Sequence, residues 1–190
     1  MLMAVKNQFK ITLLSVKYAL QREMLNKVTF ISNVLFMILN NASFIVQWII
    51  LYSLKDDVGG YTLKQVLLLW GFAASTYGLS HFIFKEAYNL TETINTGKLD
   101  AYLIQPKNVL LSCITSSVEV ASIGDLLYGY IMLAIYGLNL KSFLLFTFFS
   151  ILGSLILVSI SVIFSSLSFW FGKVDIIANT ANSLMTSFAT

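Results

Sequence analysis

Charge, cysteine, histidine and proline are all scarce in this chain, and each shortage excludes a class of protein. Charged residues make up 11% of the 190 residues, so the chain is too poor in charge to cover the surface of an ordinary soluble domain, which carries about a quarter. The single cysteine, Cys113, excludes an internal disulfide and a cysteine metal cluster, and we interpret it as a small packing residue. The single histidine, His81, cannot form a metal site of the usual kind.

Catalytic motifs are missing as well. The two Gly-Lys pairs, at Gly97 and Gly172, are each followed by an apolar residue instead of Ser or Thr, so neither belongs to a phosphate-binding loop. The sequence contains no zinc-protease motif and no nucleophile elbow. Its net charge of +3 includes no basic cluster that shares a face with stacking aromatic residues. We therefore expect a chain that is not an enzyme, holds no cofactor or metal of its own and binds no nucleic acid.

Apolar residues make up 57% of the chain and occur in long runs. A helix needs about 20 such residues to cross the hydrocarbon of a bilayer. The runs predict an all-α, polytopic helical membrane protein with a single transmembrane domain over residues 1–190. We expect four full spans, at residues 28–54, 62–84, 123–140 and 143–171. A fifth begins over residues 176–190 and is too short to cross, which predicts a C-terminally truncated chain.

Two further helices are expected at the membrane surface. Over residues 5–25, apolar side chains recur at helical spacing and basic side chains occupy other faces, which is typical of an amphipathic helix in the interface plane. This helix is either an ordinary anchoring segment or an elbow helix that positions the membrane domain. Residues 109–121 are expected to form the second interfacial helix, because that arrangement keeps Glu119 out of the hydrocarbon.

Several polar side chains nevertheless fall inside apolar runs. The first predicted span contains Asn40, Asn41 and Gln47, and amides in lipid are costly unless they are paired. We expect them either to form interhelical hydrogen bonds or to line a substrate path. Glu119 and Asp125 are the only carboxylates in the apolar run that follows residue 108. Asp125 would lie in the first turn of its span, where the helix dipole favours negative charge; the alternative is a carboxylate that faces a functional cavity.

The longest charged interruption covers residues 85–107 and contains the only proline, Pro106. We expect residues 85–96 to form one short helix, which Gly97 ends, and Pro106 to end the apolar piece that follows. The stretch is mixed in charge and needs water around it. A short helix that projects from a membrane protein into water suits contact with a soluble partner.

The positive-inside rule orients these segments. With the N-terminus in the cytoplasm, the inner segments carry nine Lys and Arg residues and the outer turns carry three. The nine are Lys6, Lys10, Lys17, Arg22, Lys27, Lys85, Lys98, Lys107 and Lys173, and the three are Lys55, Lys64 and Lys141. We therefore predict a cytoplasmic N-terminus and a cytoplasmic 85–107 loop.

Two motifs carry a resemblance to a known family. The decapeptide from Gly97 to Pro106, Gly-Lys-Leu-Asp-Ala-Tyr-Leu-Ile-Gln-Pro, is followed about twenty residues later by Ser-Ile-Gly-Asp-Leu-Leu-Tyr-Gly from Ser122 to Gly129. The first is similar to the Gly-x-Leu-Asp…Leu-x-x-Pro pattern, and the second to the Gly-Asp-Leu…Gly stretch, of the ABC-2 type transporter permeases. Their order and spacing, and the layout of nearly all 190 residues, resemble that family.

The resemblance implies a bacterial plasma-membrane permease with an N-terminal elbow helix and six spans. Two permeases, either two copies or this chain and a homologous one, would assemble with two ABC ATPase subunits that bind ATP and Mg²⁺. Residues 85–96 would be the coupling helix after the second span. The residues that the resemblance implies in ATPase coupling are Tyr88, Leu90, Ile94, Gly97, Leu99, Asp100 and Pro106.

The predicted function is thus the membrane subunit of an ATP-driven exporter. The alternative is a non-transporting scaffold or assembly factor whose cytoplasmic loop only binds a partner. The intramembrane polar residues distinguish the two, because a transporter should need them and a scaffold should tolerate their replacement by Leu.

Overall fold

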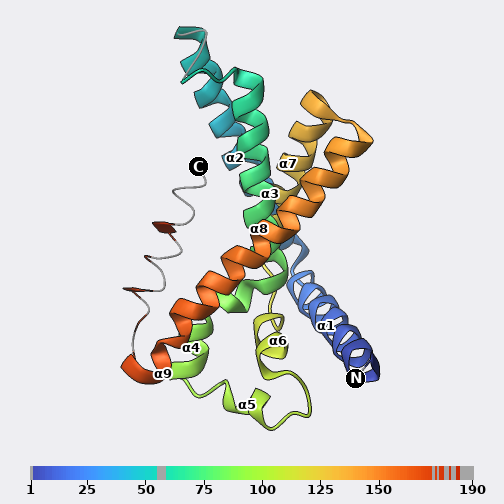
Figure 1. Ribbon diagram of the computed structural model, residues 1–190, viewed down its shortest axis with the longest axis vertical. Coiled ribbons are helices and arrows are strands. Elements are labelled where there is room, and N and C mark those ends of the chain that lie inside the picture. Colours follow the sequence, from blue (N-terminus) through green and yellow to red (C-terminus); the bar gives the residue numbers. More distant parts are fainter. Residues whose placement is uncertain are drawn as a thin grey trace. The chain divides into compact units, whose positions relative to one another are not determined.

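The computed structural model describes residues 2–54 and 59–172, together with positions 174, 176, 177, 180, 183 and 184. Within these residues the chain forms helices and no strand (Figure 1). In chain order they are α1 (Leu2–Glu23), α2 (Lys27–Leu54), α3 (Leu63–Tyr88), α4 (Leu90–Asn95), α5 (Asp100–Leu103), α6 (Val109–Ile114), α7 (Ser122–Gly137), α8 (Leu140–Ser166) and α9 (Ser168–Phe171). The fold is therefore all-α, as predicted.

Three helical stretches are long and apolar enough to cross a membrane: Lys27–Leu54, Leu63–Asn95 and Leu140–Phe171. They correspond to the first, second and fourth predicted spans. The third predicted span, residues 123–140, is represented by α7, whose 16 residues reach about 24 Å at 1.5 Å per residue, less than a bilayer core of about 30 Å. Most of the predicted fifth span, residues 176–190, lies outside the described residues.

The polar loop differs from its predicted form. The expected single helix over residues 85–96 is wrong, because α3 continues through Tyr88 after a non-helical residue at Phe84 and a separate helix, α4, begins at Leu90. The continuation of α3 is stabilised by Ala87, which is fully buried against Ile114 and Val158. Gly97 has a φ of +72°, a backbone conformation in which glycine is the favoured helix-stop residue.

The predicted interfacial helix over residues 109–121 is also shorter than expected. Its helical part, α6, ends at Ile114. Hydroxyl side chains explain the break, since they offer the backbone alternatives to helical bonding. Thr115 Oγ1 donates to the carbonyl oxygen of Leu111 over 2.7 Å, and Ser117 Oγ donates to Glu86 Oε2 over 2.7 Å.

The chain divides into two compact units. Unit 1 comprises Met1–Asn26, Ser80–Glu119 and Leu155–Ala189, and unit 2 comprises Lys27–Leu79 and Val120–Ser154. Helices α3 and α8 each contribute residues to both units. The candidate sites described below each lie within one unit.

Small residues bring α7 close to its neighbours in unit 2. A Cβ added to Gly124 of α7 would lie 2.8 Å from the Met37 Cβ of α2, and one added to Gly78 of α3 would lie 2.8 Å from the carbonyl oxygen of Ser122. At Gly129 an added Cβ would overlap Ser75 Oγ and the carbonyl oxygen of Gly71. Small residues at these positions allow helix backbones to approach closely in a membrane.

Larger apolar side chains fill the remainder of this interface. Leu67, Tyr128 and Met132 are buried together, and Ile45 and Trp48 of α2 pack against them. Helix α7 is thus held to α2 and α3 by glycine contacts and by a shared apolar cluster.

Replacing Gly129 by Val is expected to lower the midpoint of thermal unfolding by about 5 °C or more, because overpacking a tight contact costs about 1–3 kcal/mol. Gly137, on the same helix, is the matched control, since its added Cβ would meet nothing nearer than 3.9 Å. Fluorescence-detected gel filtration of heated samples in mild detergent measures both variants. Equal loss of stability in Gly129→Val and Gly137→Val would contradict the close approach of α7.

Candidate functional site

Asn41 and Asp125 form a buried hydrogen bond between α2 and α7 of unit 2. Asn41 Nδ2 donates to Asp125 Oδ1 over 2.7 Å and to the carbonyl oxygen of Met37 over 3.1 Å. The two residues are only 3% and 4% exposed. Asp125 lies in the first turn of α7, where unbonded backbone N–H groups and the helix dipole favour negative charge. Both N–H groups of the Asn41 side chain thus have hydrogen-bond acceptors, although the pair is buried in an apolar interface.

The other members of the predicted polar set lie apart from this pair. Asn40 and Gln47 are exposed on α2. Glu119 belongs to unit 1, where its Oε1 lies 3.9 Å from Lys85 Nζ, and both side chains are about one-third exposed. A pair with that exposure contributes little to stability. Of the five residues, the structure joins only Asn41 to Asp125.

A second polar cluster is centred on Glu86 in unit 1. Its Oε1 accepts a hydrogen bond from Thr93 Oγ1 over 2.8 Å, and its Oε2 accepts one from Ser117 Oγ over 2.7 Å. The carboxylate thus links the end of α3 to α4 and to the segment after α6. Glu86 could not be identified from the sequence alone, because its partner Ser117 lies 31 residues away. The available signal was the presence of hydroxyl residues on both segments that flank it.

Helix α4 and the end of α3 are fixed from inside unit 1. Tyr88 OH donates to Ser80 Oγ over 3.0 Å, and its ring stacks on His81 with 3.8 Å between ring centroids. Leu90 is 4% exposed, and Ile94 is partly buried. Three of the residues predicted to couple to an ATPase, Tyr88, Leu90 and Ile94, therefore contact the unit's own interior.

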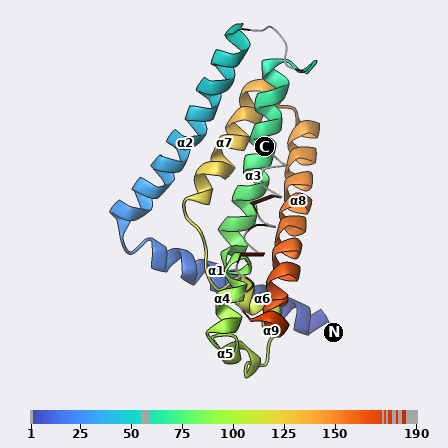
Figure 2. The ribbon, with the colours of Figure 1, turned by 90° about the vertical axis from the view of Figure 1, so that its left-hand side faces the viewer.

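The exposed end of this region is α5. Figures 1 and 2 show α5 at one end of unit 1, with α4, α6 and α9 gathered next to it. Leu103 and Ile104, at its C-terminal end, are 59% and 86% exposed. Of the predicted coupling residues here, Gly97, Asp100 and Pro106 are exposed, and Leu99 is partly buried.

Charged residues flank this apolar end of α5. Lys98 Nζ lies 3.3 Å from Glu92 Oε1, and both side chains are largely exposed. Asp100 and Lys107 are exposed as well. Because such a concentration of charge needs water, the α5 end is an aqueous surface with an apolar tip.

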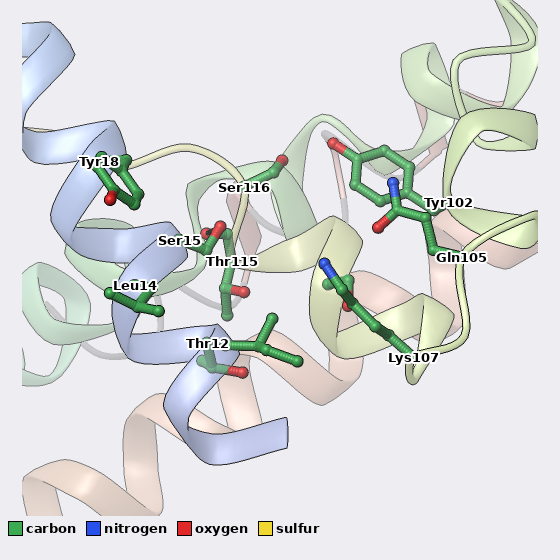
Figure 3. Close-up of a pocket in the computed structure, with 11 residues that line it drawn as sticks. Thr12, Leu14, Ser15, Tyr18, Tyr102, Gln105, Lys107, Thr115 and Ser116 are labelled. Atoms are coloured by element: carbon green, nitrogen blue, oxygen red, sulfur yellow. Dashed lines mark hydrogen bonds between the residues drawn. The ribbon is translucent and has the colours of Figure 1, made fainter. Parts of the chain in front are cut away.

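A cavity of about 400 Å³ lies between α1 and the segment that contains α5 and α6. Hydroxyl groups from both sides line it, including Thr12, Ser15 and Tyr18 of α1, and Lys107 Nζ is its cationic group (Figure 3). Ser15 Oγ donates to the carbonyl oxygen of Thr115 over 3.1 Å, and this bond joins the two sides of the cavity. Helix α1 is therefore attached to the loop region by polar contacts. No group of three or more potential metal ligands occurs among the described residues.

Cys113 of α6 is fully buried in unit 1. Burial and, to a smaller extent, the charge of Glu86 together raise the pKa of its thiol to about 11. Because the thiolate is the reactive form, the raised pKa keeps Cys113 protonated and inert at neutral pH.

Alkylation of Cys113 at pH 8 is expected to be about 100-fold slower in the folded protein than in the denatured chain, because a pKa raised by about two units lowers the thiolate fraction by that factor. The folded rate should continue to rise towards pH 11, whereas the denatured rate levels off above about pH 9. Iodoacetamide labelling across this pH range, followed by mass spectrometry, measures both. Equal rates at pH 8 would show that Cys113 is accessible and unperturbed.

Asn41→Leu is expected to destabilise the protein by about 1.5–3 kcal/mol, because it removes a hydrogen bond to a buried carboxyl group. Adding Asp125→Leu should recover part of that loss, since the buried carboxyl group is then removed as well. Thermal unfolding of the two single variants and the double variant measures the coupling. Strictly additive losses would mean that the two side chains do not interact.

A family model described as ABC-2 family transporter protein matches residues 23–190. A search of curated proteins and a search of solved structures gave no match. The matched range includes the Asn41–Asp125 pair, the Glu86 cluster and the α5 end. The chain therefore belongs to the ABC-2 family of transporter proteins.

Proposed function

We propose that this chain is the permease subunit of an ATP-driven ABC-2 type exporter in the plasma membrane of a bacterial cell. Its membrane helices form the substrate path, and its N-terminus lies in the cytoplasm. Separate ATPase subunits, two for each pair of permeases, bind ATP with Mg²⁺ and hydrolyse it. Membership of the family and three helices of membrane-spanning length support this role.

The exposed apolar tip of α5 carries the proposed ATPase contact. Ile104 is 86% exposed on a surface that its neighbouring charges place in water. An apolar side chain in that position is typical of a residue that is covered by a partner. The tip lies on the loop that the charge distribution of the sequence predicts to be cytoplasmic, where an ATPase can reach it.

The contacts of unit 1 offer a route from this tip to the membrane helices. The backbone N–H of Leu99 donates to the carbonyl oxygen of Thr93 in α4 over 3.2 Å, and Thr93 bonds Glu86 at the end of α3. Ser161 of α8 in turn donates to the carbonyl oxygen of Ala87 over 3.0 Å. A displacement of α5 is thus passed through hydrogen bonds to α3 and α8. Leu90 and Tyr88 have the supporting role of keeping α4 and α3 packed.

Ile104→Asp is expected to lower the recovery of a co-purifying P-loop ATPase by about tenfold or more, because it places a charge where an apolar contact residue would be desolvated. Ile104→Met is the matched control and should retain the ATPase. Affinity purification of the full chain from native membranes in mild detergent, with mass spectrometry of the co-purified proteins, gives the measurement.

Two outcomes would contradict the proposal in different ways. Unchanged ATPase recovery with Ile104→Asp would exclude the α5 tip as the contact. Absence of any ATPase with the unaltered chain would contradict the exporter and favour a non-transporting scaffold.

A further inference from the structure

One face of α2 has a seven-residue repeat that makes no side-chain hydrogen bond to another helix among the described residues. Positions alternating by three and four residues along the helix share this face. They are Asn33, Phe36, Asn40, Ser43, Gln47, Ile50 and Leu54, and every one of them is exposed. We refer to these seven residues as the α2 seam.

The seam contains three amides at intervals of seven residues. Asn33, Asn40 and Gln47 make no side-chain hydrogen bond to any described residue of the chain. Asn40 lies at the middle of the candidate span Lys27–Leu54, and only 6% of the apolar window of that span is buried. Amides at this depth are costly in contact with lipid and associate strongly when a partner helix supplies hydrogen bonds. The α2 seam therefore requires a covering helix.

The seam is distinct from the face that α2 uses within unit 2. Met37 and Asn41 face α7, where they contact Gly124 and Asp125. Figure 2 shows α7 beside α2 and the far side of α2 at the edge of unit 2. Satisfying the amides of the seam from outside thus leaves the Asn41–Asp125 bond in place.

We propose that the α2 seam binds the α2 seam of a second copy of this chain, in a parallel pair of helices related by a two-fold axis. A side-chain amide both donates and accepts, so identical residues facing each other across the axis can bond reciprocally. Two copies inserted in the same orientation place Asn33, Asn40 and Gln47 at the same three depths. Phe36 and Ser43 then lie between the amide layers, and Ile50 and Leu54 continue the packing beyond Gln47 in the manner of a heptad seam.

The regular spacing favours a second copy over another occupant. A seam with a repeat of 3.5 residues fits a helix that runs alongside it at a shallow angle for its whole length. A helix of different sequence would need hydrogen-bonding groups at the same three depths, whereas an identical helix supplies them by symmetry. This inference builds on the proposed function by assigning the surface where two permeases meet, but its test measures association without reference to the ATPase.

Cysteine cross-linking of the full chain in native membranes tests the pairing. Phe36→Cys, in a Cys113→Ala background and expressed in two differently tagged copies, is expected to form a disulfide-linked dimer that carries both tags when the membranes are oxidised with copper phenanthroline. Ile38→Cys is the control at nearly the same depth, because Ile38 is 40% exposed but lies on the opposite side of α2. It should cross-link at least about tenfold less, since its Cβ points away from the partner helix.

The contribution of the amides is measured in the same background. Replacing Asn33, Asn40 and Gln47 together by Leu should lower the Phe36→Cys dimer by about tenfold or more, because each interhelical amide bond contributes to association. Replacing the exposed residues Ile31, Leu35 and Ile49 by Ala, on the other side of the helix, should leave it unchanged.

Several results would overturn the assignment. These are equal cross-linking at Phe36 and Ile38, a cross-linked product that contains a different protein, no product from Phe36→Cys, or a dimer that survives loss of all three amides.

Discussion

A polar side chain in an apolar membrane helix must find a hydrogen-bond partner, because lipid supplies none. Helix α2 has amide side chains on two of its sides. Asn41 donates to Asp125 of α7 over 2.7 Å, and this bond connects the two helices at the middle of α2. The adjacent Asn40 points to another side, where no described residue of the chain receives it. Of these two neighbouring residues, Asn41 thus forms a bond within the chain, and Asn40 belongs to the surface that we assign to a second copy.

The Asn41–Asp125 bond also depends on the glycines around it. Gly78 and Gly124 allow α3 and α2 to lie against α7 close to Asp125, so the carboxyl group is enclosed by three helices. In unit 1 a carboxylate has a similar connecting role, because Glu86 bonds both Thr93 and Ser117. In each unit, therefore, a buried or partly buried carboxyl group forms hydrogen bonds to other elements. In unit 2 it connects two helices, and in unit 1 it connects α3 to the loop region.

Much of the architecture was predictable because long apolar runs have few physical solutions. The three long spans, the helix-stop conformation of Gly97 and the position of Asp125 in a first turn all follow from local composition. The family was recognisable from the two motifs at residues 97–106 and 122–129, since their order and spacing resemble those of the family.

What could not be predicted depends on contacts between distant residues. Sequence gave no means of deciding which of Asn40, Asn41 and Gln47 meets Asp125, because all three are compatible with an interhelical bond. The early end of α6 follows from the bond between Ser117 and Glu86, and the inward position of Leu90 follows from packing within unit 1. The exposure of Ile104 likewise depends on the position of α5 at the end of unit 1, which the local sequence does not determine.

An ATPase can act only from the cytoplasm, so the proposed coupling requires the α5 end to lie on that side of the membrane. Lys98, whose side chain is 63% exposed, can be replaced by Cys in a Cys113→Ala background and treated with a membrane-impermeant maleimide. We expect strong labelling in inverted membrane vesicles and none in intact cells until they are permeabilised. Strong labelling in intact cells would place the α5 end outside and contradict coupling to an ATPase through this loop.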